Sequence, residues 1–126
     1  MSSPRAVLAK AGLRPKKRLG QNFLTNTAIA GRIAGFALEG APPRARTIEI
    51  GAGTGVLTRA LVDAGAQLTA VEIDPELVAV LRSREDIAAA QIVAADALTF
   101  DYRAWSKGQP WRVAGNLPYN LSLIHI

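Results

Sequence analysis

Residues 47–62 read TIEIGAGTGVLTRALV. The first four residues form a β-rich run, glycines occupy positions 51, 53 and 55, and apolar residues at helical spacing follow from Val56 to Val62. This order predicts a strand, a glycine turn and a helix. Glycine has no Cβ, so the backbone of such a turn can approach a bound ligand and present amide donors at the start of the helix. The stretch favours a nucleotide-like ligand, although a tight turn with a purely structural role would have the same pattern.

Strands and helices alternate along the rest of the chain. We expect three further strands, at residues 68–73, 91–95 and 111–114. Between them we expect helices at residues 56–62 and 74–83 and a short helix or turn at 100–105. This alternation predicts an α/β fold with a parallel sheet that carries helices on both faces. Ligands of such sheets bind beyond the carboxyl ends of the strands, which is where four residues fall, Gly51, Glu72, Asp96 and Asn116.

Two of the helices have recognisable starts. Thr25 or Asn26 is expected to cap a helix that ends near Gly40, ahead of a Pro-Pro pair. Asp74 is expected to cap the helix that has Pro75 in its first turn. The inward face of the first helix is predicted from the spacing of its apolar residues, Ile29, Ile33, Phe36 and Ala37.

Composition excludes several kinds of site. The 126 residues are 49% hydrophobic and 20% charged, which is typical of a globular domain with a core. There is no cysteine and one histidine, His125, so we expect no disulfide framework, no metal site and no Ser-His-Asp triad. No apolar run is long enough to span a membrane or to form a signal-peptide core, so we expect a cytoplasmic protein without membrane attachment.

Basic residues are concentrated in the first part of the chain. The first 46 residues contain nine Lys or Arg and one acid, whereas the remaining residues contain six Lys or Arg and nine acids. A basic arm suits a polyanionic partner, because each cation that meets a phosphate releases condensed counterions. A solubilising tail and an organellar transit peptide are the alternatives for this arm.

The acid that ends the second strand makes the expected ligand more specific. Glu72 lies about 20 residues after the first glycine, where a carboxylate can accept hydrogen bonds from both hydroxyls of a ribose. The dinucleotide fingerprint G-x-G-x-x-G requires glycine at position 56, but the chain has Val56. The pattern E-x-G-x-G-x-G instead resembles that of class I methyltransferases, and the resemblance implies S-adenosylmethionine as the cofactor. By this resemblance Gly51 approaches the methionine part of the cofactor, and Gly53 is a cofactor-binding residue of the same turn. Glu72 is expected to hold the ribose, and Asp96 to accept a hydrogen bond from the adenine amino group.

The tetrapeptide Asn116-Leu117-Pro118-Tyr119 follows the fourth strand. At this position the amino-directed methyltransferases that it resembles carry Asn or Asp, a proline-containing turn and an aromatic residue, so the resemblance implies that these four residues are catalytic. An exocyclic adenine nitrogen is a poor nucleophile until acceptors hold its hydrogens, and the Asn116 oxygen with a backbone carbonyl near Leu117 can do that. Pro118 would stiffen the turn, and Tyr119 would stack on an everted base.

Residues 16–24, KKRLGQNFL, indicate which family of methyltransferases the chain resembles. They look like the K-x-x-x-G-Q-N-F-L segment of the rRNA adenine dimethyltransferase family, whose motifs are matched in order from about residue 16 to residue 122. The family's activity is dimethylation of two adjacent adenines at N6 near the 3′ end of small-subunit rRNA. The implied partners are ribosomal RNA and the small-subunit precursor, and the protein is expected to act as a monomer. The resemblance adds cofactor contacts at Asn22, Leu24 and Asn116, and RNA contacts at Lys16, Lys17 and Arg18.

The chain departs from the family pattern after the N-L-P-Y-N motif. Family members continue with the rest of the sheet and a small helical domain. We therefore expect a basic flexible arm at residues 1–20 and a partial cofactor-binding domain at residues 21–126, truncated after strand four. Leu123 to Ile126 do not resemble the family's continuation. Strand four is expected to have an unpaired apolar edge, and the chain by itself is expected to be unstable or inactive.

Three other functions stay open from the sequence. Large-subunit rRNA methyltransferases of the resistance type share these motifs. A nucleotide-dependent oxidoreductase is disfavoured by Val56. A non-catalytic RNA-binding or assembly factor could keep the same fold.

Overall fold

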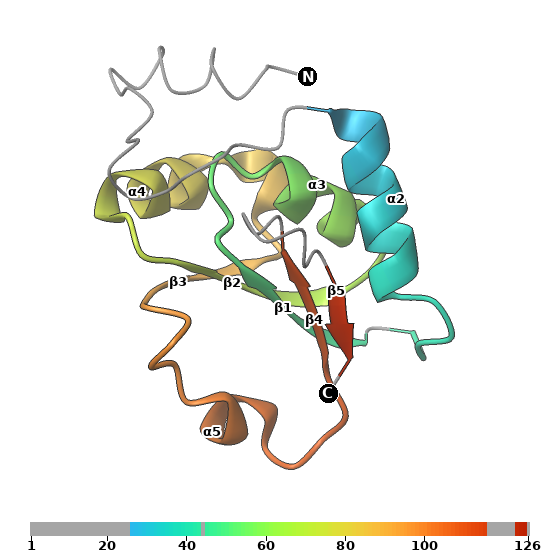
Figure 1. Cartoon of the computed structure of the whole chain (residues 1–126). Helices are drawn as coiled ribbons and strands as arrows, with labels where there is room; N and C mark the ends of the chain where they lie inside the picture. Colours follow the sequence, from blue (N-terminus) through green and yellow to red (C-terminus); the bar gives the residue numbers. More distant parts are fainter. Residues whose placement is uncertain (1–25, 44, 116–122, 126) are drawn as a thin grey trace.

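A five-stranded sheet forms the centre of the fold (Figure 1). The computed structural model describes residues 26–43, 45–115 and 123–125. The strands are β1 (Arg46–Ile50), β2 (Gln67–Glu72), β3 (Gln91–Ala94), β4 (Arg112–Gly115) and β5 (Leu123–His125). Their order is β3-β2-β1-β4-β5; the first four strands run parallel to one another, and β5 is antiparallel to β4. The predicted α/β class and its four parallel strands are confirmed.

Among the described residues, three helices cover one face of the sheet and one short helix covers the other (Figure 1). The helices are α2 (Thr27–Ala37), α3 (Val56–Asp63), α4 (Pro75–Ser83), the single turn η2 (Glu85–Ile87) and α5 (Tyr102–Ser106). Figure 1 shows α2, α3 and α4 above the sheet and α5 below it. Among the described residues, none of the helices is long and apolar enough to cross a lipid bilayer.

The predicted helix starts at Asn26 and Asp74 are confirmed. The Asn26 side chain accepts hydrogen bonds from the backbone N–H groups of Ala28 and Ile29, at 2.9 and 3.1 Å. The Asp74 side chain accepts from Glu76 N–H at 2.9 Å, and Pro75 occupies the first helical position. Both side chains satisfy amide donors that the first turn of a helix leaves without partners.

The predicted inward face of α2 is wrong in two of its four positions. Ile29 is 43% exposed and Phe36 is 62% exposed. The buried face is made by Ala30, Ala34 and Ala37, which recur at the same helical spacing. Small side chains let α2 lie close against α3. The alanines therefore face α3, and the bulky Ile29 and Phe36 are exposed.

The expected unpaired edge of β4 is also wrong. The backbone of β5 pairs with β4 in antiparallel register, with Val113 opposite Ile124 and Ala114 opposite Leu123. The prediction rested on the chain stopping before the strands with which the family continues, but residues 123–125 supply an antiparallel neighbour, which needs no crossover helix.

The core lies on both faces of the sheet. On the face of α2, α3 and α4, alternate strand residues such as Leu68, Ala70 and Ala114 are buried against the helices. On the other face, Ile48, Val71 and Val113 are buried under a half-exposed cluster of four aromatic residues, Phe100, Tyr102, Trp105 and Trp111. The Tyr102 and Trp111 rings are stacked with centroids 5.4 Å apart, and Trp105 meets Trp111 edge to face. Tyr102 and Trp105 belong to α5, and Phe100 and Trp111 extend the apolar cover that this five-residue helix provides.

Candidate functional site

The carboxyl ends of β1, β2 and β3 bring three of the predicted site residues to one edge of the sheet. Gly51 follows β1, Glu72 ends β2, and Asp96 lies two residues after β3. Parallel pairing places these strand ends side by side, with Ile50 opposite Val71 and Glu72 opposite Ala94. Figure 1 shows the turn after β1 rising from this edge to the start of α3.

The glycine turn has a backbone that only glycine adopts without strain. The φ angles of Gly51, Gly53 and Gly55 are +70°, +58° and +91°. The turn is held to the sheet, because Gly51 N–H donates to the Val71 carbonyl at 2.9 Å. Within the described part of the chain, a Cβ built on Gly51 would have no atom within 4 Å, so none of those residues fills the space beside it.

Glu72 connects the glycine turn to the start of α4. Its Oε1 accepts from Gly53 N–H at 2.8 Å, and its Oε2 accepts from Asp74 N–H at 3.0 Å. The residue is only 3% exposed. Two backbone donors therefore fix the orientation of the carboxylate, and the acid that was predicted to hold a ribose also shapes the turn beside it.

A second buried acid lies on the same face of the sheet. Glu49 on β1 is 1% exposed and accepts a hydrogen bond from the Thr58 hydroxyl of α3 at 2.6 Å. Burial raises the pKa of Glu49 to about 8, the Thr58 hydrogen bond opposes that shift, and the charge of Glu72 adds to it. At neutral pH the Glu49 carboxyl group is therefore largely protonated, whereas its neighbour Glu72 is held by two amide donors.

Asp96 is half-buried at the end of the third strand. Its Oδ1 accepts from Leu98 N–H at 2.9 Å, which turns the chain directly after the acid. Leu98 itself is 93% exposed, and Ile73, the residue after Glu72, is 55% exposed. Neither of these two apolar residues was predicted from the sequence as a site residue, although each lies within two residues of a predicted acid.

Other predicted site residues lie outside the described residues. Asn116 directly follows β4, and a Cβ on its neighbour Gly115 would lie 2.8 Å from the Ile50 carbonyl oxygen, so β4 and β1 approach closely here. The remaining predicted site residues are not described by the structure, so their position relative to this edge stays a prediction. They are Lys16, Lys17, Arg18, Asn22, Leu24, Asn116, Leu117, Pro118 and Tyr119.

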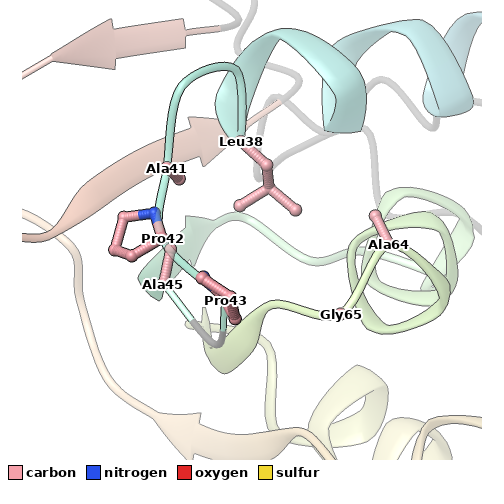
Figure 2. A pocket seen from close by; sticks show the side chains of 7 residues that line it. All are labelled: Leu38, Ala41, Pro42, Pro43, Ala45, Ala64 and Gly65. Carbon is pink, nitrogen blue, oxygen red and sulfur yellow. The ribbon is translucent and has the colours of Figure 1, made fainter.

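A separate cavity of about 520 Å³ lies at the opposite edge of the sheet (Figure 2). Figure 2 shows Leu38, at the end of α2, and Ala64, after α3, on two sides of it. Pro42, Pro43 and Gly65 complete most of its wall, together with Ala41 and Ala45. The side chains of these seven described lining residues carry no charge and no hydrogen-bonding group, unlike the acids at the glycine-turn edge.

Comparison with known proteins gives a consistent result. A family model described as "Ribosomal RNA adenine dimethylase" matches residues 12–125. The ribosomal RNA small subunit methyltransferase A of Methylococcus capsulatus is 46% identical over 109 residues, which cover 86% of this chain and 42% of that protein. The protein of the same name from Magnetococcus marinus is 41% identical over 126 residues, which cover 95% of this chain and 44% of that protein.

A solved structure supports the fold as well. The crystal structure of the 23S rRNA methyltransferase ErmE is similar with a TM-score of 0.66 and 35% sequence identity, over 79% of this chain and 39% of that chain. The chain thus spans less than half the length of each of these three proteins.

Proposed function

The chain belongs to the ribosomal RNA adenine dimethylase family, and on that premise we propose that it is the cofactor-binding part of an enzyme that uses S-adenosylmethionine to dimethylate adenines of small-subunit rRNA. The observation that carries this proposal is the position of Glu72, a buried carboxylate that two backbone donors aim beside the glycine turn. The acceptors are two adjacent adenines near the 3′ end of the RNA, each modified at N6.

The described residues fit the proposed cofactor. Gly51 leaves open space for the methionine part, and Glu72 offers carboxylate oxygens to the ribose hydroxyls. Asp96 offers an acceptor to the adenine amino group, while Ile73 and Leu98 supply exposed apolar surface for the faces of a flat base. Such apolar surface favours a ligand with an aromatic ring, because its burial removes it from water. When bound, S-adenosylmethionine supplies a methyl group on a positively charged sulfur.

We propose that the tetrapeptide after β4 positions the substrate. The Asn116 oxygen and a backbone carbonyl near Leu117 hold the hydrogens of the adenine amino group, so that the nitrogen lone pair is directed at the methyl donor. Pro118 restricts the turn, and Tyr119 stacks on the everted base. The close approach of β4 and β1 supports this arrangement, because Gly115, which precedes the motif in the sequence, lies opposite Ile50, which precedes the glycine turn.

The remaining assignments concern the first residues of the chain. We propose that Asn22 and Leu24 add cofactor contacts and that a basic arm at residues 1–20 binds RNA through Lys16, Lys17 and Arg18. The rest of the chain, residues 21–126, forms the partial cofactor-binding domain. The protein acts as a monomer on the small-subunit precursor in the cytoplasm, where that substrate is found.

A methyl-transfer assay tests the proposal. A full-length protein that carries this sequence is incubated with methyl-labelled S-adenosylmethionine and with either small-subunit precursor or large-subunit RNA. We expect label in two adjacent adenines of the small-subunit RNA, located by primer extension. Asn116→Ala should abolish the label while cofactor binding, measured by calorimetry, is largely kept. Absence of cofactor binding in the wild-type protein would remove the basis of the proposal.

The similarity to ErmE supports a second candidate, methylation of large-subunit rRNA. The higher identity to two proteins named for the small subunit favours the first. Label found only in large-subunit RNA would reverse that order, and binding of cofactor without any methylation would indicate a non-catalytic RNA-binding factor.

A further inference from the structure

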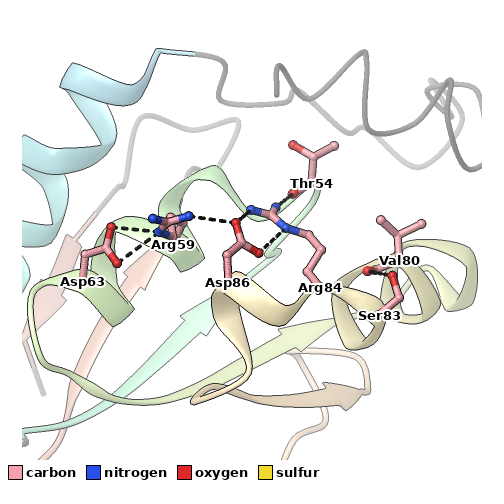
Figure 3. A network of polar contacts seen from close by, with 7 residues as sticks. All are labelled: Thr54, Arg59, Asp63, Val80, Ser83, Arg84 and Asp86. Atoms are coloured by element: carbon pink, nitrogen blue, oxygen red, sulfur yellow. Dashed lines mark hydrogen bonds and ion pairs between the residues drawn. The ribbon is translucent and has the colours of Figure 1, made fainter. Parts of the chain in front are cut away.

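Arg84, the residue after α4, reaches across to the glycine turn (Figure 3). Its Nη1 donates to the Thr54 carbonyl oxygen at 2.6 Å, and its side chain is only 16% exposed. A charged donor on a neutral carbonyl forms a stronger hydrogen bond than an amide does, and partial burial strengthens it further. The turn is therefore held by a side chain that approaches from the α4 side.

This contact fixes the orientation of one peptide unit of the turn. The carbonyl oxygen of the Thr54–Gly55 peptide accepts from Arg84, and its N–H donates to the Ala52 carbonyl at 3.0 Å. A Cβ on Gly55 would lie 2.5 Å from Arg84 Nη1 and 2.9 Å from a methyl carbon of Leu81. The third glycine of the turn is thus required by its φ of +91° and also by the guanidinium packed against it.

The guanidinium is itself held in place by a chain of ion pairs. Nε and Nη2 of Arg84 bind the two carboxylate oxygens of Asp86 at 2.9 and 2.6 Å. Asp86 also accepts from Arg59 of α3 at 2.9 Å, and Arg59 in turn binds Asp63 (Figure 3). The hydrogen bond from Arg84 is the main reason that the pKa of Asp86 lies below its ordinary value. The network joins the end of α4, η2 and α3 around the glycine turn.

We propose that Arg84 is a positioning residue for the cofactor, which holds the glycine turn in its binding shape before the cofactor arrives. The inference rests on the proposed function, because it assumes that the turn receives S-adenosylmethionine. The hydrogen bonds of Arg84 go to the Thr54 carbonyl and to Asp86, neither of which is proposed to contact the cofactor, so its contribution is to preorganisation. A turn that is already ordered loses less conformational entropy on binding, and the affinity is correspondingly higher.

Arg84→Ala tests this role, with Arg82→Ala as a matched control. Arg82 lies two residues earlier, in the last turn of α4, and also donates to a backbone carbonyl, that of Ile92, but this carbonyl belongs to β3 and lies outside the turn. In a full-length protein that carries this sequence, we expect Arg84→Ala to raise the KM and the calorimetric Kd for S-adenosylmethionine by about tenfold, the typical effect of losing a charged hydrogen bond. The kcat should stay within about twofold, because the contact is not specific to the transition state. Arg82→Ala should leave both constants unchanged.

A conservative pair keeps the test decisive if Arg84→Ala does not fold. Lysine at position 84 retains a charge and one donor but not the two-point contact with Asp86, so Arg84→Lys should raise the Kd less than Arg84→Ala and more than Arg82→Lys. Circular dichroism records whether each variant is folded. A Kd for Arg84→Lys equal to those of Arg82→Lys and the wild-type protein would overturn the positioning role, whether or not Arg84→Ala folds. A wild-type protein that does not bind S-adenosylmethionine would instead overturn the proposed function.

Discussion

At the scale of single residues, two buried acids on adjacent strands have different hydrogen-bond partners. Glu72 accepts hydrogen bonds from two backbone amides, which fix the orientation of its side chain. Glu49 has one hydroxyl donor, from Thr58, and complete burial raises its pKa to about 8. One acid is therefore suited to bind ligand hydroxyls, and the other is suited to link β1 to α3 as a neutral group.

The raised pKa of Glu49 makes the stability of the fold depend on pH. In the unfolded chain this pKa is near its ordinary value of 4.5, so between 4.5 and about 8 the folded state holds a proton that the unfolded state has lost. The contribution to the free energy of unfolding is fully present below the lower value and is lost as the pH rises towards the upper one, by up to about 1.4 kcal/mol per pH unit. Urea unfolding of the chain at several pH values should show this loss in the wild type and not in Glu49→Gln. Parallel pH profiles for the two proteins would contradict the assignment, and Glu85→Gln, at an exposed acid, serves as the control.

Glu72→Gln should weaken the binding of S-adenosylmethionine. A glutamine can accept from one of the two backbone amides, but its NH₂ group faces the other donor, so both the turn and the ribose lose an acceptor. We expect the calorimetric Kd to rise roughly ten- to a hundredfold, as for loss of a buried hydrogen bond to a charged group. An unchanged Kd would mean that the ribose is held elsewhere.

At the scale of elements, the sequence predicted the strands and helix starts well, because their signals are local. Asn26 and Asp74 are short polar side chains ahead of apolar helical repeats, and both are caps in the structure. The inward face of α2 was predicted poorly, because the choice between Ala34 and Phe36 depends on how closely α3 approaches. The pairing of β5 with β4 is a tertiary contact with no local signal.

The alanine face of α2 gives a prediction about stability. Ala34→Leu places a larger side chain between α2 and α3, where the residue is 1% exposed, and should lower the free energy of unfolding by roughly 1–3 kcal/mol. Phe36→Ala, at a residue that is 62% exposed, should change it by no more than about 0.5 kcal/mol. Chemical denaturation of the two variants measures both effects. The opposite order would restore the bulky residues as the inward face.

At the scale of the whole molecule, the two edges of the sheet differ in chemistry. The carboxyl edge carries the glycine turn with Glu72 and Asp96, whereas the amino edge has an apolar cavity next to Pro42 and Pro43. The sequence predicted the polar edge, because parallel strands that end in acids and glycines bring these residues to one side. It did not predict Arg84, since an arginine after a helix has no pattern that identifies its distant partner.

The basic arm belongs to this scale too, because its proposed partner is a polyanion. Replacing Lys16, Lys17 and Arg18 with neutral residues should reduce the salt dependence of RNA binding, with a slope smaller by about 0.7 per lost phosphate contact on single-stranded RNA. Binding measured over a range of salt concentrations gives this slope. Identical slopes for the variant and the wild type would assign the arm a role in solubility.

The central claim, that the carboxyl edge of the sheet binds S-adenosylmethionine, is tested most directly by a crystal structure of the protein with this cofactor. We predict that the ribose hydroxyls lie within hydrogen-bond distance of the Glu72 carboxylate and that the adenine amino group faces Asp96, with the glycine turn in the conformation described above. A cofactor found in the cavity next to Pro42 and Pro43, or at any place away from the glycine turn, would contradict the claim.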